Sequence, residues 1–286
     1  MKITKAVITA AGFGTRMLPA SKNVPKEMLC VVDKPAIHYI VQEVVDSGVS
    51  DILIVTSRGK DVMENYFDYN PELENRMLAA GKDEQVAEIR KIADMANIMF
   101  VRQKEVKGFG HAVWCAKSFI GGDSFAVLSG DDIFMANTPV TKQLIDAAEK
   151  HGANTVGVKE VSNADIGKYC TTDIKQLEKD LFEVFKLIEK PKPEQIMSNY
   201  AVLGRYVLSK EIFPILENIP KGIGGEIQLT DGLNRLCQVE KMLAVAFEGV
   251  RYDTGNVKGY LQATIEIALR NPEIAEWLRE YIKTLG

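Results

Sequence analysis

The sequence lacks the features that would place the protein in a membrane, on nucleic acid or outside the cell. Its apolar runs are all shorter than the roughly 18 to 20 residues that a membrane-spanning helix needs. The N-terminus shows neither the apolar core nor the cleavage site of a signal peptide, so we expect none. Positive charge is not in excess, because 35 Lys and Arg face 39 Asp and Glu, for a net charge of −4. Any bound anion must therefore be held by a local site.

Cysteine and histidine are scarce, which narrows the chemistry that side chains can perform. The cysteines are widely spaced, form no CxxC pair and have no histidine cluster near them: Cys30, Cys115, Cys170 and Cys237. This usage predicts reduced, partly buried thiols and a cytoplasmic protein, and it argues against a zinc site. No Ser-His-Asp or Cys-His constellation is evident. His38 and His151 lie within or at the end of predicted helices, where we expect structural roles.

The remaining composition is that of a globular protein, and its pattern is α/β. Of the 286 residues, 46% are hydrophobic, which is enough for a sizeable core. Short β-rich runs alternate with helical patterns in the first half. We predict strands over residues 3–9, 51–56, 98–102 and 124–129, and helices over 35–47, 111–120 and 138–151. This alternation predicts a parallel or mixed sheet that is covered by helices on both faces.

The second half of the sequence is less regular. We predict strands over residues 154–161, 181–189 and 199–208, and helices over 211–218, 226–238 and 257–269. Asn271 and Pro272, as N-cap and first helical residue, predict the start of a terminal helix. A charged, weakly helical stretch over residues 60–97 indicates a surface insertion. Because no flexible linker or repeat is visible, we expect one continuous domain over residues 1–286.

The stretch "AAGFGTRMLPASKNVPKEM", residues 10–28, follows the first predicted strand. It is not a dinucleotide fingerprint, because the third glycine is missing and its two prolines interrupt a continuous helix; it is not a Walker A loop either. What remains is a stiff loop at the carboxyl end of a strand, where open α/β sheets bind ligands. Arg16, Lys22 and Lys26 make a polyphosphate the natural partner of this loop. An ordinary surface loop with scattered cations is the alternative.

Other polar residues also follow predicted strands. Asp131 and Asp132 come after residues 124–129, where carboxylates suit Mg²⁺, although turn or helix-capping aspartates are the alternative. Gln103 could pair with the N3–H and O4 edge of uracil, whereas a solvent-facing side chain is the default for glutamine. Gly108 precedes a helix, and so does Gly110. They let backbone approach a base or simply shape the turn, and we expect the adjacent His111 to open the helix.

Taken together, GxGTR followed by PKxM resembles the signature of the sugar nucleotidyltransferases. The continuation "KEMLCVVDKPAIHYIVQE" resembles the bacterial UTP–glucose-1-phosphate uridylyltransferases, also called UDP-glucose pyrophosphorylases. So do "RQKEVKGFGHAV", "GDD", "IEKPKPEQ", "SNYAVLGRYVLSKEIF", "GGEIQLTDGL" and "YDTGNVKGY". These matches occur in the family's order and cover nearly the whole chain.

The resemblance implies a three-layer α/β/α sandwich with a mixed, mostly parallel, Rossmann-like sheet. It also implies transfer of a uridylyl group from UTP to glucose 1-phosphate, Mg²⁺ dependence, a homodimer or homotetramer, and no nucleic-acid or membrane partner. About residues 1–150 would bind the nucleotide, and about residues 151–286 would bind the sugar and form subunit contacts.

The family's site residues carry over to matching positions of this sequence. Those expected to act on the phosphates in catalysis are Arg16, Lys26 and Lys190. Those expected to bind the nucleotide are Ala11, Gly12, Gly14, Thr15, Gln103 and Gly108. Those expected to bind the sugar are Asp132, Glu189 and Lys190, although "EKPKPE" could instead be a solvated charged loop. Asp131 is the expected metal ligand, and Asp253 is the candidate second ligand.

The sequence departs from the family pattern at three positions. Thr9 and Cys30 replace usual prolines, and Cys170 replaces a usual glycine in a segment that lies near the sugar in relatives. The sugar preference, glucose or galactose, therefore stays open. A thymidylyltransferase or another sugar-nucleotide pyrophosphorylase, a metal-dependent glycosyltransferase, and a non-catalytic regulator that binds nucleotide sugars are the alternative functions.

Overall fold

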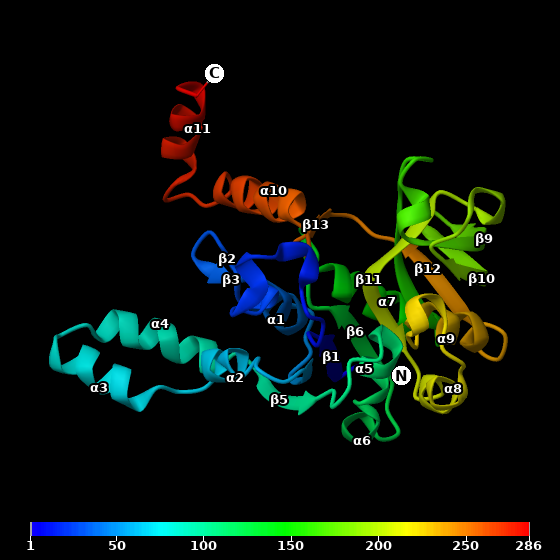
Figure 1. The fold of residues 1–286 in the computed structure, drawn as a ribbon, viewed down its shortest axis with the longest axis horizontal. Helices are drawn as coiled ribbons and strands as arrows, with labels where there is room; N and C mark the ends of the chain where they lie inside the picture. Colours follow the sequence, from blue (N-terminus) through cyan, green and yellow to red (C-terminus); the bar gives the residue numbers. More distant parts are fainter. Residues whose placement is uncertain (1, 286) are drawn as a thin grey trace.

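A nine-stranded sheet forms the centre of the computed structural model, which describes residues 2–285 (Figure 1). Its strand order is β5-β4-β1-β6-β11-β8-β12-β10-β9. These strands are β1 (Lys5–Thr9), β4 (Asp51–Thr56), β5 (Asn97–Arg102), β6 (Phe125–Ser129), β8 (Asn154–Glu160), β9 (Cys170–Glu178), β10 (Leu181–Glu189), β11 (Tyr200–Leu208) and β12 (Met242–Ala246). All of them except β10 and β11 run in one direction. The predicted mixed, mostly parallel sheet is confirmed.

Helices cover both faces of this sheet. Ala6, Val7 and Ile8 of β1 are fully buried, and they alternate between the faces because side chains along a strand point to opposite sides. Ala6 and Ile8 share one core with two long helices, and Val7 shares the other core with four shorter ones. The first pair is α1 (Ala36–Asp46) and α7 (Val140–His151); the others are α5 (Phe109–Trp114), α6 (Lys117–Ile120), α8 (Ile212–Asn218) and α9 (Leu229–Leu236). The three-layer prediction is confirmed.

The predicted insertion forms a helical arm that projects from the body (Figure 1). It comprises α2 (Val62–Phe67), α3 (Pro71–Ala79) and α4 (Asp83–Ala93). Asn70 caps α3 by accepting a hydrogen bond from the backbone of Leu73, and Arg90 joins α4 to Glu74 of α3 at 2.7 Å. The arm therefore has internal polar contacts of its own.

Several elements differ from the sequence-based predictions. The terminal helix α11 (Ala275–Lys283) begins after Pro272, because the Asn271 side chain accepts from the backbone of Glu273 and residues 272–274 form turns. The helix predicted from residue 226 begins at Leu229. Strands β9 and β12 were not predicted, nor were the two small sheets, β2 (Cys30–Val31) with β3 (Lys34–Pro35) and β7 (Asp132–Met135) with β13 (Val250–Asp253). They are short or charged, and they depend on distant partners.

The C-terminal helices lead away from the sheet. Helix α10 (Val257–Ala268) begins where the Asn256 side chain accepts from the backbone of Gly259, and it packs near β13. Helix α11 extends beyond it, away from the body (Figure 1). Within residues 2–285, no helix is both long enough and apolar enough to cross a membrane.

Candidate functional site

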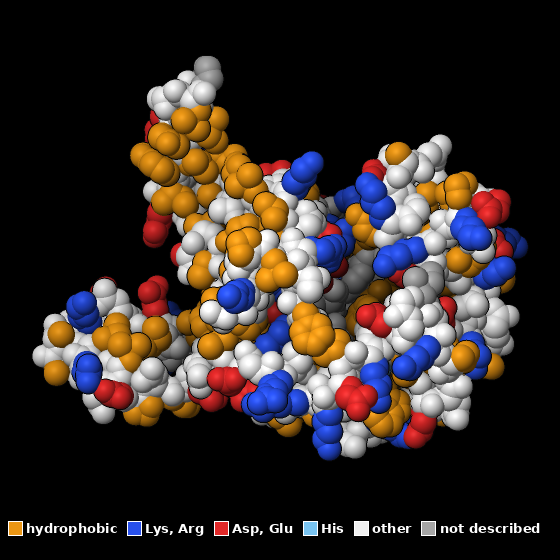
Figure 2. Space-filling model, in the orientation of Figure 1, with side chains coloured by type: hydrophobic (Ala, Val, Ile, Leu, Met, Phe, Trp, Pro, Cys, Tyr) orange, Lys and Arg blue, Asp and Glu red, His pale blue; other side chains and the backbone are white. Residues whose placement is uncertain are grey.

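A cavity of about 700 Å³ opens where β1, β5 and β6 end. Figure 2 shows Lys and Arg side chains around a hollow near the middle of the molecule. Most of the predicted site residues line this cavity: Ala11, Gly12, Thr15, Arg16, Gln103, Gly108, Asp131, Asp132, Lys190 and Asp253. The carboxyl ends of parallel strands meet at one edge of a sheet, so residues far apart in the sequence come together here.

Three predicted residues do not line this cavity. Gly14 lies next to the cavity-lining residues Gly12 and Thr15 but is not exposed to the cavity. Its backbone has φ 67°, and a Cβ there would lie close to Ser21 and Lys26. Lys26 reaches the site through Asp131. Glu189 lines a smaller neighbouring cavity of about 160 Å³, where it accepts a hydrogen bond from Thr230 at 2.7 Å.

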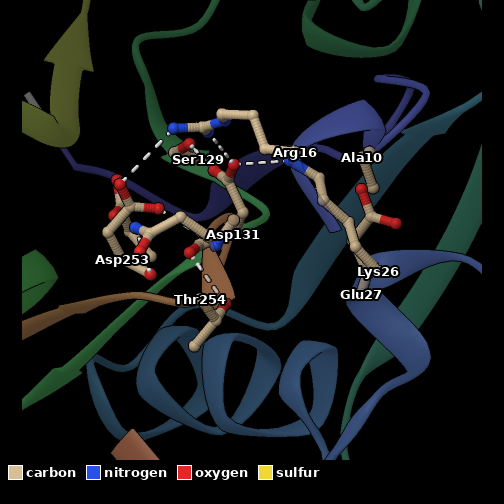
Figure 3. Close-up of polar contacts among 12 residues, drawn as sticks. Ala10, Arg16, Lys26, Glu27, Ser129, Asp131, Asp253 and Thr254 are labelled. Carbon is tan, nitrogen blue, oxygen red and sulfur yellow. Dashed lines mark hydrogen bonds and ion pairs between the residues drawn. The ribbon is translucent and has the colours of Figure 1, made fainter. Parts of the chain in front are cut away.

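Asp131 is the centre of a cluster of charged side chains, drawn in Figure 3. The Lys26 ammonium lies 2.5 Å from Asp131 Oδ2, and Arg16 Nη2 lies 3.5 Å from the same atom. Ser129 Oγ donates to Asp131 Oδ1 at 2.7 Å, and the Thr254 backbone and hydroxyl both donate to the Asp131 carbonyl. These contacts fix the carboxylate toward the loop of residues 10–28.

Opposite charges in this cluster keep each other ionised despite burial. Burial alone would raise the pKa of Asp131, but the Lys26 ammonium, the Ser129 hydroxyl and Arg16 hold that pKa well below its usual range. Burial likewise opposes the charge of Lys26, yet Asp131 and then Glu27 raise the Lys26 pKa above its ordinary value. Asp131 is therefore an anion and Lys26 a cation at neutral pH.

The donor set fits a small, hard metal ion. A side-chain carbon on Gly255 would lie 2.5 Å from Asp131 Oδ2 and 3.0 Å from Asp253 Oδ1, so both carboxylates converge on that position. Arg16 now bridges them, with Nη1 3.6 Å from Asp253 Oδ2. No group of three His, Cys, Asp or Glu able to hold a metal occurs among the described residues. Two carboxylates are nevertheless enough for Mg²⁺ when phosphate and water complete its shell.

A buried ion pair that sequence reasoning missed supports the loop from behind. Lys60 Nζ lies 2.9 Å from a Glu27 oxygen and donates to the Ala10 carbonyl at 2.6 Å. The two side chains are 8% and 1% exposed. Burial raises the pKa of Glu27 and lowers that of Lys60, against the attraction between them. The available signal was that Lys60 follows a parallel strand, as Gln103 and Asp131 do.

Gln103 is buried rather than solvent-facing, with 3% exposure. Its Nε2 donates to the Gly108 carbonyl at 3.2 Å and lies 2.7 Å from His111 Nδ1. Gly108 has φ 104°, and a Cβ there would lie 2.7 Å from the Glu226 side chain and 2.8 Å from the Ile227 carbonyl. This close approach requires glycine.

Asp132 joins the two cavities, because it lines both. Its side chain is buried, and Oδ1 lies 2.7 Å from Arg251 Nη2. Burial raises the pKa of Asp132 to about 6, despite this arginine. Sequence reasoning missed Arg251, although it stands two residues before Asp253.

A second missed group holds the loop that carries Asp131 and Asp132. Arg205 donates to the carbonyls of Ser129 and Asp132 at 3.4 and 2.8 Å, and it pairs with Glu43 at 2.7 Å. The Arg205 side chain is 0% exposed. An arginine inside the predicted strand of residues 199–208 was the signal, because a buried charge requires partners.

Lys190 lines the larger cavity, and two of the three positions that depart from the family pattern line a cavity as well. Lys190 has φ 44°, a left-handed conformation that is uncommon for a residue with a side chain, and its backbone donates to the Tyr169 carbonyl at 2.9 Å. Thr9 lines the larger cavity and the buried Cys170 the smaller one. Cys30 is exposed and away from both cavities; its carbonyl accepts from the Tyr260 hydroxyl.

His38 and His151 lie in helices, as predicted from the sequence. His38 is buried in α1, and its Nδ1 lies 3.0 Å from the Tyr66 hydroxyl. His151 ends α7, next to Gly152 with φ 60°. His111 does not open its helix as expected, because α5 begins at Phe109 and the predicted helix over residues 111–120 is divided between α5 and α6; His111 also contacts Gln103.

The chain matches a known protein family and several curated relatives over most of its length. The model of the family described as nucleotidyl transferase matches residues 5–269. The chain is 49% identical over 282 residues to the UTP–glucose-1-phosphate uridylyltransferase YngB of Bacillus subtilis, covering 99% of this chain and 95% of that protein. It is 47% identical to a UTP–glucose-1-phosphate uridylyltransferase of Staphylococcus epidermidis, covering 99% of each.

Solved structures agree with the sequence comparisons. A UTP-bound UGPase from Acinetobacter baumannii superposes with a TM-score of 0.93 at 38% identity, covering 99% of this chain and 100% of that one. A UDP-glucose pyrophosphorylase in complex with UDP-glucose superposes with a TM-score of 0.85 at 37% identity, covering 94% and 100%.

Proposed function

The chain belongs to the nucleotidyl transferase family, and we propose that it transfers the uridylyl group of UTP to α-D-glucose 1-phosphate, forming UDP-glucose and pyrophosphate. Full-length relatives at 45 to 49% identity are named for this reaction, and solved neighbours hold UTP or UDP-glucose. The observation that carries the proposal is the convergence of Arg16, Lys26, Asp131 and Lys190 at one edge of the sheet.

The chemistry needs alignment and charge rather than a general base. An oxygen of the sugar phosphate attacks the α-phosphorus of UTP; the new P–O bond forms as the bond to the β-phosphate breaks, and pyrophosphate leaves in line. The attacking oxygen is already anionic at neutral pH. The main obstacle is repulsion between two anions, and fixed cations reduce it.

The cations divide between the two substrates. We assign Arg16 and Lys26 to the triphosphate and the leaving pyrophosphate, because both lie on the glycine-containing loop beside Asp131. Lys190 serves the sugar phosphate, since an ammonium acts as a point charge for phosphate. Removing one such donor from a preorganised site costs on the order of 3 to 4 kcal/mol of transition-state stabilisation.

A divalent metal is the usual cofactor of the family, and Mg²⁺ suits this donor set. Asp131 would hold it, with Asp253 as the second carboxylate, because the two converge beside Gly255. When bound, the metal neutralises triphosphate charge. Arg16, which bridges both carboxylates here, would then turn toward phosphate.

The base and the sugar occupy opposite ends of the cavity in this proposal. Gln103 and Gly108 read the uracil edge, with Ala11, Gly12 and Thr15 along the nucleotide. Gly14 shapes the turn between them. Glu189 and Asp132 bind sugar hydroxyls near the smaller cavity, where Cys170 also lies. The chain then acts as one domain, with a nucleotide half over about residues 1–150 and a sugar half over about residues 151–286.

We further assign the C-terminal helices to contacts within a homodimer or homotetramer. Helices α10 and α11 expose large apolar side chains: Val257, Leu261, Ile265, Trp277, Tyr281 and Ile282. A cytoplasmic location fits four unpaired cysteines.

A substrate panel tests the reaction. Pyrophosphate release is measured with Mg²⁺, glucose 1-phosphate or galactose 1-phosphate, and UTP, dTTP, CTP or GTP. We expect UTP with glucose 1-phosphate to be fastest and a chelator to stop turnover. Faster release with dTTP would favour a thymidylyltransferase. Sugar transfer from UDP-glucose to an acceptor, without reversal by pyrophosphate, would indicate a glycosyltransferase and overturn the proposal.

A further inference from the structure

We propose that His111 sets the pyrimidine specificity of the site by fixing which end of the Gln103 carboxamide faces the nucleobase. The inference rests on the proposed function, in which Gln103 reads the base. His111 does not itself line the larger cavity, so it would act as a positioning residue through Gln103.

The hydrogen bonds around Gln103 determine the orientation of its amide. The Gly108 carbonyl can only accept, so the amide nitrogen must face it, at 3.2 Å. The same nitrogen lies 2.7 Å from His111 Nδ1. Both amide hydrogens are therefore committed, His111 Nδ1 must be an acceptor, and the imidazole proton lies on Nε2.

The opposite end of the amide is left for a ligand. Among the described residues, the polar contacts of the Gln103 side chain are both made by Nε2, and none donates to Oε1. Gln103 also lines the larger cavity. An acceptor thus faces the position assigned to the base. Oε1 can accept from N3–H of uracil, but no amide hydrogen is left for O4, so the pairing with O4 that was expected from the sequence is not available to Gln103.

This polarity distinguishes pyrimidines. Uracil and thymine carry a hydrogen on N3 and can donate to Oε1, whereas N3 of cytosine is an acceptor and would face another acceptor. A reversed amide would favour cytosine. Sites that present a fixed hydrogen-bonding group can reject a mismatched substrate strongly, because a buried polar group is then left unpaired.

The surroundings of His111 keep Nδ1 an acceptor. The imidazole stacks on Trp114, with ring centroids 5.6 Å apart and planes 22° apart, and Cys115 Sγ lies 4.0 Å from Nδ1. Burial and then Lys107 lower the pKa of His111, while Glu105 opposes them. Glu105 pairs with Lys107 at 2.8 Å, which offsets its effect. The imidazole is therefore neutral at pH 7 and above.

The decisive experiment compares UTP with CTP in His111→Leu, His111→Asn and the unchanged protein. The ratio of kcat/KM for the two nucleotides is measured, together with their equilibrium affinities by calorimetry. We expect His111→Leu to relax discrimination against CTP by about tenfold, because UTP binds more weakly once the amide is free to turn. His111→Asn keeps an acceptor at a similar distance from the backbone and should retain the discrimination. Lys117→Ala, on the neighbouring α6, is the control for general effects.

A double-mutant cycle separates positioning from a structural effect. In a Gln103→Ala background, His111→Leu should not change the UTP/CTP ratio further, because the amide on which it acts is gone. An unchanged ratio in His111→Leu, or an equal change in both backgrounds, would overturn the inference. If the unchanged protein neither binds nor turns over UTP, the proposed function fails; if it does both and the variants leave the ratio intact, only the role of His111 fails.

Discussion

Two arginines of the site show opposite uses of the same side chain. Arg16 is 61% exposed and spans two carboxylates at 3.5 and 3.6 Å, whereas Arg205 is fully buried and holds Glu43 at 2.7 Å. The first can exchange its partners for an incoming phosphate. The second cannot leave without stranding a buried carboxylate. The ion pairs of Arg16 with Asp131 and Asp253, which we call open, are therefore available for binding. The buried pair of Arg205 with Glu43, which we call closed, keeps the loop between β6 and β7 in place.

Breaking a closed pair should have the largest effect on stability. Arg205→Leu leaves Glu43 buried without its cation, and we expect the free energy of unfolding to fall by about 3 to 5 kcal/mol in a denaturant titration. Glu43→Leu combined with Arg205→Leu removes both charges and should lose less than the single variant. A loss below about 1 kcal/mol in the single variant would contradict the role given to this pair.

Changing the open cluster should instead affect activity. Asp131→Asn keeps the shape of the side chain but removes its charge, and we expect turnover to fall by about 10²- to 10³-fold, as for loss of one preorganised electrostatic group. Initial rates of pyrophosphate release measure this loss. The variant also leaves the Lys26 ammonium without its buried partner, so the free energy of unfolding should fall as well, and the rates are compared where a denaturant titration shows both proteins to be folded. Asp123→Asn, at an exposed ion pair with Lys5, is the matched control. Full turnover in Asp131→Asn would refute the metal assignment.

Lowering the pH should reduce the free energy of unfolding through a buried histidine, His38. Burial lowers the pKa of His38 from 6.5 to about 4, so the unfolded chain binds its proton first as the pH falls. Above pH 6.5, His38 is neutral in both states and does not change the free energy of unfolding. Between pH 6.5 and about pH 4 this free energy declines, by at most about 3 kcal/mol.

Unfolding measured across this pH range tests the assignment to His38. His38→Gln should flatten the decline, while His151→Gln, for the histidine that ends α7, should leave it unchanged. Equal profiles for all three proteins would assign the acid sensitivity to other groups.

The smallest expected effect is that of Arg16→Met on stability. Because the side chain is exposed and its ion pairs are long, we expect the free energy of unfolding to change by no more than about 0.5 kcal/mol. Activity should nevertheless fall, chiefly through weaker UTP binding or slower transfer. A large loss of stability would show that Arg16 belongs with the closed group.

The sequence predicted well whatever depends on local pattern. The strands at Asp51–Thr56 and Leu181–Glu189 match residue for residue. The first, DILIVT, is an apolar and β-branched run after its aspartate, and the second, LFEVFKLIE, is mainly apolar with single charged residues between. Strands β12 and β13 depend on distant pairing with β8, β10 and β7, and the sequence shows only short runs there. The order of strands across the sheet was likewise beyond a local pattern.

The site divides in the same way. The residues that line the cavity follow strand ends or lie in recognisable motifs, so Arg16, Gln103 and Asp131 could be identified. The supporting contacts could not, because Lys60 with Glu27 and Arg205 with Glu43 join residues far apart in the chain. Only the folded structure shows that these charges are buried and paired.

The backbone of Lys190 has a consequence for protein engineering. Its left-handed φ of 44° is one that glycine adopts freely and that costs other residues on the order of 1 to 2 kcal/mol. A screen that selected only for heat resistance would therefore favour Lys190→Gly. The variant selected in this way would be more stable but would lack the ammonium that we assign to the phosphate of glucose 1-phosphate.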